Sequence, residues 1–350
     1  MPPWRVDIFD PPGAGWQKKE QGGIMGQQLR VGIIGTGKHG SRYARHISED
    51  LPENFALKAI SRRSDQGRQQ AELWRTTWYP DWRELVSSKE VDVVISATTP
   101  DLNPEIGRLC AQEKKPLLLE KPLTTDYPEA ERLVALFAGQ GVPLTVAQTL
   151  RHNSIVLALK EHLPRMGQLY ALSACHRLEP STLSWLAEPK IAGGGVIYHT
   201  AVHLFDALRF ICADEIVRVR ASQARVHNRQ LEDLLTAEIV LSRGGRGVID
   251  AGKLAPARCG RFEFVCADGQ LQGDQIHGTL QELQGAAIRN LPVAAPGPTI
   301  LPLLEEWHRF LLGKGANPIP AGEGLAAVRL CHACQVSIAS GDWVEVAAVG

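Results

Sequence analysis

Between residues 29 and 150, two hydrophobic patterns alternate along the chain. Short, nearly all-apolar runs predict strands covered on both faces, and apolar residues three or four apart predict helices between them. Strands and helices that alternate on this scale predict right-handed βαβ units and a parallel sheet. The predicted strands are 29–34, 55–60, 91–97, 116–119 and 142–147, and the predicted helices are 66–74, 82–86, 104–113 and 127–139.

The pattern changes at about residue 151. After a predicted helix at 157–163, no helical pattern separates the last four predicted strands, which is typical of a largely antiparallel sheet. Two later helices follow a proline-rich surface loop at 294–302. We therefore expect a second domain, of the α+β class, at 151–350. Its predicted strands are 168–177, 215–226, 234–241, 247–254 and 262–267, and its later helices are 303–312 and 324–339.

Residues 1–28 show little regular periodicity, because proline pairs and glycines interrupt them. They also lack the continuous apolar core of a signal peptide. We interpret them as a flexible N-terminal extension, which could take part in contacts between subunits. Met25 stands just before the first predicted strand. Translation that starts at Met25 is therefore an alternative explanation of this segment.

The first predicted strand runs directly into a glycine motif, G-x-G-x-x-G, at 35–40, and a helical pattern follows it. Gly35 permits a tight turn, Gly37 lets the backbone approach a pyrophosphate, and Gly40 lets helix and strand pack closely. The N–H groups and the positive dipole end of the helix then favour phosphate. The motif predicts a dinucleotide-binding Rossmann domain, a doubly wound parallel sheet, at 29–150. The alternative is a glycine-rich turn that binds nothing.

Ligands of such sheets bind beyond the carboxyl ends of the strands. The residues at those ends are our candidates for cofactor binding. They are Gly35, Thr36, Gly37, Lys38, His39 and Gly40 after the first strand, Ser61, Arg62 and Arg63 after the second, Thr98 and Thr99 after the third, and Glu120 and Lys121 after the fourth.

The end of the second strand distinguishes two cofactors. An NAD site usually places Asp or Glu there, to bind the ribose 2′-hydroxyl. This chain has Ser61, Arg62 and Arg63, which donate hydrogen bonds to a 2′-phosphate, whereas a carboxylate would repel it. We therefore favour NADP over NAD. A solvated basic turn is the alternative.

Charge and cysteine content narrow the class of protein. Lys and Arg together number 38, as do Asp and Glu, so the formal net charge is zero and gives no argument for nucleic acid or an anionic membrane surface. No apolar stretch is long enough to span a bilayer. The seven cysteines lack small-domain spacing and indicate free thiols in a reducing, cytoplasmic setting. Cys331 and Cys334 fall in a predicted helix, where we favour buried thiols over metal or redox chemistry.

Three consecutive glycines at 193–195 precede a helical segment that ends in His203-Leu204-Phe205-Asp206. His199 and His203 are four residues apart, which predicts that they share one face of a helix. Such a pair can bind zinc, but no acid or cysteine motif nearby completes a site, so we expect no metal.

These motifs resemble those of the Gfo/Idh/MocA superfamily, which includes glucose–fructose oxidoreductase and inositol dehydrogenase. The resemblance covers about residues 29–346. It rests on four stretches in the expected order, namely 32–40, Glu120-Lys121-Pro122-Leu123, 193–206 and 340–345. It implies a Rossmann domain followed by a domain with an open sheet, which commonly supports dimers or tetramers. Members usually transfer hydride between nicotinamide and a carbinol of a sugar, polyol or related compound.

The resemblance also implies two catalytic residues. Lys121 matches the family's lysine near the nicotinamide and the reacting hydroxyl, and His203 matches its proton-accepting helix histidine. The chemistry suits both types, because a base near neutral pKa takes the hydroxyl proton and a cation stabilises the developing alkoxide. Read alone, Lys121 would be a surface lysine before a proline turn and His203 a satisfied helix histidine.

Three positions depart from the family's pattern. His199 stands where the family often has an aspartate that orients the histidine, so His199 either takes part in a different proton relay or is not catalytic. Asp101 and Pro104 stand where the family often has asparagine and histidine. The neighbouring Asn103 is a candidate to hydrogen-bond the cofactor, and we expect its side chain first to cap the helix at 104–113, with Pro104 at the first helical position.

Together these features predict a cytoplasmic, homo-oligomeric oxidoreductase that prefers NADP and acts on a hydroxyl or carbonyl of a small polar molecule. One alternative is a reductase of an unsaturated bond or imine, which would need no base at His203. The other is a cofactor-binding regulatory protein that has lost catalysis, which the histidine at position 199 supports.

Overall fold

The computed structural model of the chain describes residues 28–348. The chain forms two compact units, and each contains segments that are distant in the sequence. Among the described residues, the first unit comprises those up to Thr124, Pro128–Ala147 and Ile300–Leu325, and the second comprises Thr125–Tyr127, Gln148–Thr299 and those from Ala326 on. The expected N-terminal extension, apart from Gln28, and the alternative start at Met25 lie outside the described residues.

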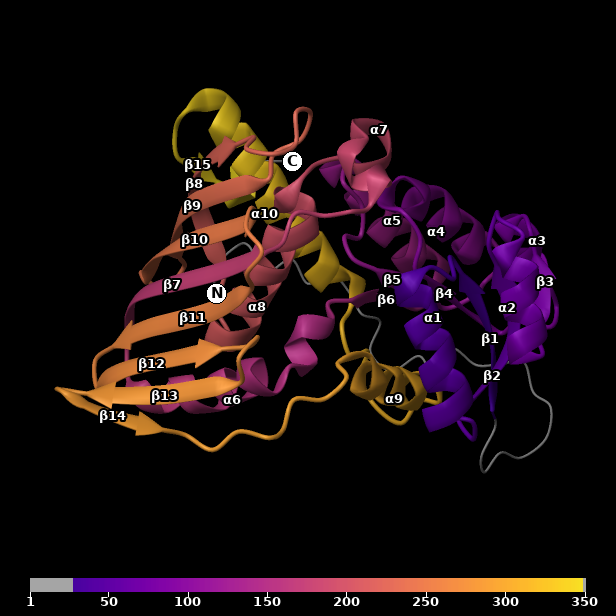
Figure 1. The fold of residues 1–350 in the computed structure, drawn as a ribbon, viewed down its shortest axis with the longest axis horizontal. Helices are drawn as coiled ribbons and strands as arrows, with labels where there is room; N and C mark the ends of the chain where they lie inside the picture. The colour runs from indigo at the N-terminus through magenta and orange to yellow at the C-terminus, as the bar shows by residue number, and fades with distance from the viewer. Residues whose placement is uncertain (1–27, 349–350) are drawn as a thin grey trace. The chain divides into compact units, whose positions relative to one another are not determined.

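The first unit is built on a six-stranded sheet with the order β3-β2-β1-β4-β5-β6, and every pairing in it is parallel (Figure 1). This order is that of a dinucleotide-binding Rossmann sheet, and the expected fold is confirmed. Of these strands, only the short edge strand β3 was not predicted from the sequence. The strands are β1 (Leu29–Ile34), β2 (Phe55–Ser61), β3 (Thr77–Tyr79), β4 (Val93–Ser96), β5 (Leu117–Glu120) and β6 (Leu144–Ala147).

Helices connect these strands, as the alternating pattern predicted. They are α1 (Lys38–Arg45), α2 (Gln66–Trp74), α3 (Trp82–Ser87), α4 (Asn103–Gln112) and α5 (Tyr127–Gln140). A further helix from late in the chain, α9 (Ile300–Leu311), packs into the same core. Its Trp307 is fully buried and stacks on Phe55 of β2, with ring centroids 5.9 Å apart. The predicted boundary at residue 150 therefore does not describe which segments share this core.

The second unit is built on a nine-stranded sheet with the order β14-β13-β12-β11-β7-β10-β9-β8-β15. All of its pairings are antiparallel except that of β7 with β10, so the expected mostly antiparallel sheet is confirmed. The strands are β7 (Leu169–Leu178), β8 (Ile216–Ala224), β9 (Leu234–Leu241), β10 (Arg246–Lys253), β11 (Cys259–Cys266), β12 (Gly269–Asp274), β13 (Thr279–Gln284), β14 (Ala287–Asn290) and β15 (Val344–Glu345).

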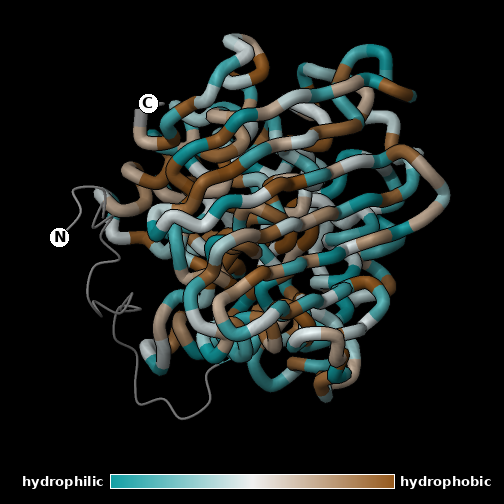
Figure 2. The backbone as a smooth tube through the Cα atoms, turned by 90° about the vertical axis from the view of Figure 1, so that its left-hand side faces the viewer, coloured by the Kyte–Doolittle hydropathy of each residue, from teal (hydrophilic) through white to brown (hydrophobic). Residues whose placement is uncertain are grey.

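Helices cover one face of this sheet, chiefly α6 (Ser154–His162), α8 (Val202–Cys212) and α10 (Ala321–Ser340) (Figure 1). Alternate residues of β9, from Leu235 to Leu241, are buried against that side, and the residues between them are more exposed. Figure 2 shows the same alternation as changes between teal and brown along the strands. The sheet therefore has one apolar, covered face and one polar face.

The cysteines were expected to be free thiols, and their reduced state in solution stays a prediction. All seven lie in the described part of the chain, and none forms a disulfide. Cys331 and Cys334 are buried in α10, and burial raises the pKa of both thiols. They are therefore packed as apolar groups, as the sequence suggested. Within residues 28–348, no helix has the length and apolar character that crossing a membrane requires.

Candidate active site

The three glycines of the turn between β1 and α1 have different surroundings and different structural roles. Gly35 has φ +84°, and a Cβ there would lie 2.7 Å from the carbonyl oxygen of Ala97. A Cβ at Gly40 would lie 1.9 Å from the carbonyl oxygen of Gly35. Both glycines are therefore required for packing. A Cβ at Gly37 would meet no atom within 4 Å, so Gly37 leaves open space in front of the helix.

This open space suits the pyrophosphate of a dinucleotide. Gly37 is the N-cap of α1 and provides no side-chain cap, so the first N–H groups of the helix receive no bond from it. The first turn contains no acidic residue, and Lys38 and His39 begin it on the exposed side. Helix N–H groups, a positive dipole end and a lysine together favour an anion. The residues present therefore fit the cofactor that the motif predicted.

A hydrogen-bond network on Thr36 fixes the shape of this turn. Thr36 is fully buried and donates from Oγ1 to Oε1 of Gln70 on α2, at 2.6 Å. The Thr36 carbonyl accepts hydrogen bonds from Gln70 Nε2 at 3.0 Å and from Arg62 at 2.8 Å. The role of Gln70 was not predicted, because nothing in the sequence of a polar helix indicates that one glutamine faces a turn in another segment.

The three residues of the basic turn at the end of β2, Ser61, Arg62 and Arg63, have different surroundings. Ser61 is buried, and its carbonyl accepts the N–H of Gly35 at 2.9 Å. Arg62 is half-buried and directs its guanidinium to the protein itself, at Thr36 and at Ser64. Arg63 is exposed, and its guanidinium makes no hydrogen bond or ion pair with other residues in 28–348. Of the three predicted donors, Arg63 is thus the one whose charge remains available to a ligand.

Residues after β4 complete this edge of the first unit. The Thr98 N–H nitrogen would lie 3.0 Å from a Cβ at Gly35, so Thr98 borders the glycine turn. Thr99 precedes a short 3-10 turn, Pro100–Leu102, that leads into α4.

The predicted capping role of Asn103 is wrong. Asn103 lies inside the first turn of α4, its side chain is buried, and its Nδ2 donates to the carbonyl oxygen of Pro122 at 2.9 Å. The N-cap position belongs to Leu102, which makes no side-chain cap. The amide therefore donates to a buried carbonyl oxygen and does not accept the N–H groups of the helix start.

Glu120 and Lys121 lie at the carboxyl end of β5. The Glu120 carboxylate accepts a hydrogen bond from the Tyr43 hydroxyl at 2.8 Å, a contact that sequence analysis missed. Burial lowers the pKa of Lys121, and the adjacent Glu120 carboxylate opposes this effect. Lys121 is therefore a partly desolvated cation beside the Glu120 carboxylate. Such a lysine is suited to take part in proton transfer or to stabilise a developing negative charge.

The two predicted histidines belong to the second unit, and each has its own partners. His199 lies in a π-turn, Ile197–Ala201, that precedes α8. Its Nε2 is 2.9 Å from the carbonyl oxygen of Ala192, and its ring meets that of Trp185 edge-on at 5.4 Å. His203 lies in the first turn of α8, with its ring 6.2 Å from that of His176 on β7. The relay between His199 and His203 stays a prediction.

Glu232, another residue that sequence analysis missed, holds the glycine triplet before this π-turn. Its carboxylate accepts the N–H of Gly195 at 2.8 Å and that of Ile197 at 3.1 Å. A Cβ at Gly195 would lie 1.9 Å from the Glu232 carbonyl oxygen, and one at Gly193, where φ is +68°, would lie 1.9 Å from Thr125 Oγ1. The triplet is therefore explained by close packing that orients the histidine segment.

A buried ion pair fixes α8 at its middle. Arg151 lies in the turn after β6. Its Nε donates to Oδ2 of Asp206 at 2.9 Å, and its Nη2 donates to Oδ1 at 2.6 Å. Their side chains are 10% and 1% exposed. A two-pronged pair of this kind restricts both the position and the rotation of the helix that carries His203.

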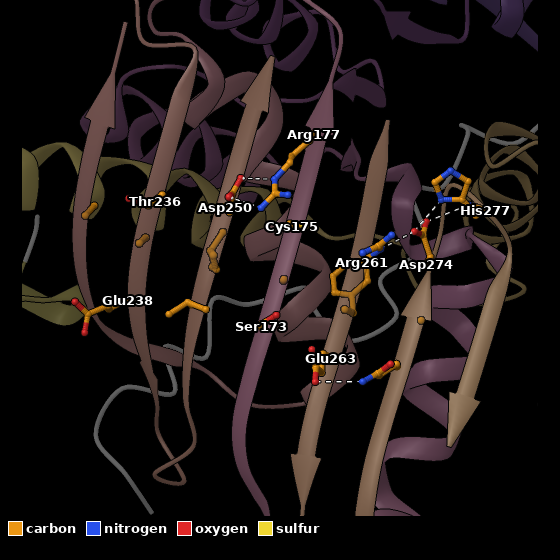
Figure 3. A pocket seen from close by; sticks show the side chains of 18 of the residues that line it. Ser173, Cys175, Arg177, Thr236, Glu238, Asp250, Arg261, Glu263, Asp274 and His277 are labelled. Atoms are coloured by element: carbon orange, nitrogen blue, oxygen red, sulfur yellow. Dashed lines mark hydrogen bonds and ion pairs between the residues drawn. The ribbon is translucent and has the colours of Figure 1, made fainter. Parts of the chain in front are cut away.

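The uncovered face of the second sheet has a shallow hollow of about 1090 Å³. Figure 3 shows polar and charged side chains from several strands pointing into it. Arg177 pairs with Asp250 at 2.6 Å, and Arg261 pairs with Asp274 at 3.2 Å. This face contains none of the predicted site residues. Across residues 28–348, no group of three or more His, Cys, Asp or Glu side chains is arranged to hold a metal ion.

Comparisons with known proteins agree with this architecture. Residues 29–148 match the family model described as an oxidoreductase family with an NAD-binding Rossmann fold, and residues 164–272 match that of the GFO/IDH/MocA C-terminal domain. The oxidoreductase YrbE of Bacillus subtilis is 26% identical over 92% of this chain and 98% of the relative. Myo-inositol 2-dehydrogenase of Thermotoga maritima is 27% identical over 72% of this chain and 77% of the relative.

Solved structures share the fold at lower identity. Levoglucosan dehydrogenase in complex with NADH and levoglucosan matches with a TM-score of 0.82 at 21% identity, over 91% of this chain and 100% of that one. Aldose–aldose oxidoreductase of Caulobacter crescentus, complexed with glycerol, matches with a TM-score of 0.80 at 16% identity, over 91% of this chain and 100% of that one.

Proposed function

Because the chain belongs to the Gfo/Idh/MocA oxidoreductase family, we propose that it transfers hydride between a nicotinamide dinucleotide and a hydroxyl or carbonyl carbon of a small sugar, polyol or related molecule. The observation that carries the proposal is the turn at Gly37. This turn is open and begins a helix. Like Lys121, it follows the carboxyl end of a strand in the parallel sheet. Relatives named inositol dehydrogenase support a polyol substrate.

The residues that would hold the dinucleotide are those of the glycine turn, with Thr98 and Thr99 beside it and Ser61 and Arg63 at the neighbouring strand end. When bound, the nicotinamide supplies the carbon that accepts or donates hydride. His203 accepts the proton of the substrate hydroxyl, because an imidazole is a base near neutral pH. Lys121 stabilises the developing alkoxide with its positive charge.

We propose NADP as the preferred cofactor. Arg63 supports this choice, because it is exposed, has no partner within residues 28–348, and follows the strand whose end faces the ribose in such folds. The levoglucosan dehydrogenase structure contains NADH, which makes NAD the alternative. The comparison of kcat/KM with NADP and NAD decides between them, and Arg63→Ala should lower kcat/KM with NADP while leaving that with NAD nearly unchanged. A wild-type protein that works equally well or better with NAD would contradict the proposal.

The second sheet supports a proposal about assembly. Its uncovered face presents Val248, 54% exposed, among the paired charges drawn in Figure 3. We propose that two or four copies of the chain associate through this face in the cytoplasm, where seven unlinked cysteines are stable. Light scattering at several concentrations measures the assembly, and a monomer at micromolar concentration would contradict it.

Turnover tests the central proposal. The purified protein, with NADP or NAD and a panel of polyols, sugars and ketones, should reduce or oxidise the dinucleotide, and His203→Ala should abolish most of this activity. A protein that binds the dinucleotide but turns over no member of the panel would favour a regulatory role. Activity that survives His203→Ala unchanged would favour reduction of an imine or an unsaturated bond.

A further inference from the structure

Two side chains from different helices hold the turn that contains Lys121. From α1, the Tyr43 hydroxyl donates to the Glu120 carboxylate at 2.8 Å. From α4, Asn103 Nδ2 donates to the Pro122 carbonyl oxygen at 2.9 Å. The residues immediately before and after Lys121 are thus each tied to a separate element of the first unit.

The burial of these donors indicates that their polar atoms have a purpose beyond packing. Tyr43 is 0% exposed and lies in the apolar core with Val31, Ile33 and Ile47. Phenylalanine would fill the same volume without a hydroxyl that must be desolvated. Burial and the nearby carboxylate raise the pKa of Tyr43 well above its usual value, so the hydroxyl stays protonated and donates a hydrogen bond to Glu120. Asn103 is 2% exposed and likewise provides a single directed donor.

We propose that Tyr43 and Asn103 are positioning residues, which fix the Glu120 carboxylate and the backbone around Lys121 so that the lysine ammonium group is correctly placed and charged for hydride transfer. This inference rests on the role proposed for Lys121 above. Neither residue is assigned contact with the substrate. They act through the turn, because a shift of the reacting groups by about 1 Å can cost about a hundredfold in rate.

The charges around the turn give this arrangement a measurable signature. The Glu120 carboxylate raises the pKa of Lys121 against the larger lowering that burial causes. The same two charges act in opposite directions on His39 of α1, whose pKa is lowered by loss of surrounding water, raised by Glu120, and lowered by Lys121, Arg42 and Lys38. A carboxylate held in place by Tyr43 therefore keeps Lys121 charged over a wider range of pH than a mobile one would.

One helix connects this support to the cofactor turn. Helix α1 begins next to Gly37, and Tyr43 lies one and a half turns further along the same helix. The helix start that faces the open space and the hydroxyl that holds Glu120 are therefore parts of one rigid element. A change in the position of α1 would alter both.

The test compares Tyr43→Phe with Tyr79→Phe. The Tyr79 hydroxyl also makes one side-chain hydrogen bond in the first unit, to Ser88 at 3.3 Å, and it supports no predicted site residue. Tyr43→Phe should lower kcat roughly tenfold, the equivalent of one hydrogen bond to a charged group, with a smaller change in KM. The limb of the pH profile that reports ionisation of Lys121 should move to lower pH. Tyr79→Phe should change neither quantity.

Asn103→Asp provides an independent arm, because it preserves size but removes the donor to Pro122. It should also lower kcat. Asn103→Gln keeps the amide but places it one methylene further from the backbone, so its kcat should also lie below that of the wild type. Wild-type kcat and an unshifted pH profile in both Tyr43→Phe and Asn103→Asp would overturn the inference.

Lys121→Met separates failure of this inference from failure of the proposed function. An inactive Lys121→Met protein beside fully active Tyr43→Phe and Asn103→Asp proteins would reject the positioning role alone. A fully active Lys121→Met protein would reject the lysine's role in the reaction, and the positioning role with it.

Discussion

The substitution Gly37→Ala should separate the stability of the fold from its ability to bind a dinucleotide. In the free protein, Gly37 has φ −72° and ψ −159°, an extended conformation that alanine adopts without strain. Its Cβ would meet no atom within 4 Å. Because alanine restricts the unfolded chain more than glycine does, the substitution should stabilise the free protein by about 0.4–1 kcal/mol. This corresponds to a rise in Tm of roughly 1–4 °C.

Dinucleotide binding should respond in the opposite direction. The new methyl group occupies the space through which the pyrophosphate approaches the N–H groups of α1. Loss of one hydrogen bond to a charged phosphate costs about 1.5–3 kcal/mol. The Kd for the dinucleotide should therefore rise by roughly 10–150-fold. Titration followed by the fluorescence of the reduced nicotinamide measures Kd, and calorimetry without ligand measures Tm.

Two other glycines provide controls. Gly139, in α5, also has open space at its Cβ position, so Gly139→Ala should raise Tm without changing Kd. At Gly40 a Cβ would lie 1.9 Å from the Gly35 carbonyl oxygen, so Gly40→Ala should reduce the free energy of unfolding by about 1–3 kcal/mol, lower Tm accordingly, and weaken binding as well. An unchanged Kd in a stable Gly37→Ala protein would show that the pyrophosphate does not bind at this turn.

The remaining predictions concern the cofactor, the base and the support of α8. Ser61→Asp should raise the ratio of kcat/KM with NAD to that with NADP, and an unchanged ratio would remove this strand end from cofactor choice. His203→Ala should lower kcat by roughly a hundredfold or more with dinucleotide affinity preserved, measured by steady-state kinetics and titration. His199→Asp should preserve or raise kcat if residue 199 assists that base, whereas an unchanged pH profile in His199→Asp would show a packing role. Asp206→Asn should destabilise the protein by about 3–5 kcal/mol in denaturant unfolding, because it removes the carboxylate charge from a buried, two-pronged ion pair. Asp250→Asn, at the exposed pair with 30% of the Asp250 side chain accessible, should cost about 1 kcal/mol or less.

The parallel sheet was predictable because its strands are buried on both faces. All four residues of β4 and of β6 are buried, and each lies within an apolar run that the sequence shows plainly. The strands β12, β13 and β14 were not predicted. They lie toward the edge of the second sheet; β12 and β13 are interrupted by glycine or glutamine residues, and β14 has only four residues. Their pairing follows from neighbouring strands rather than from alternation of their own.

The glycine turn was predictable for a related reason. Backbone close to a phosphate, to a strand and to a helix start requires glycine at fixed spacing, and Gly35 and Gly40 show the close contacts that the motif implies. The residues that support the turn leave no such pattern. Gln70 and Tyr43 each read as an ordinary helix residue, and their function depends on which segment the fold places opposite them.

Asn103 shows why local rules fail at this site. The capping rule considers backbone groups within one turn of helix, and by that rule an asparagine before Pro104 should bond its own helix start. In the structure its Nδ2 donates to the Pro122 carbonyl oxygen, 19 residues away in the sequence. A buried carbonyl without a donor costs about 1–3 kcal/mol, whereas the first N–H groups of a helix can be satisfied by water when they face solvent. The side chain therefore lies against the buried carbonyl, and no side chain caps the helix start. The Tyr43 hydroxyl likewise bonds to a partner far away in the sequence, Glu120, so the residues that hold Lys121 become visible only once the chain has folded.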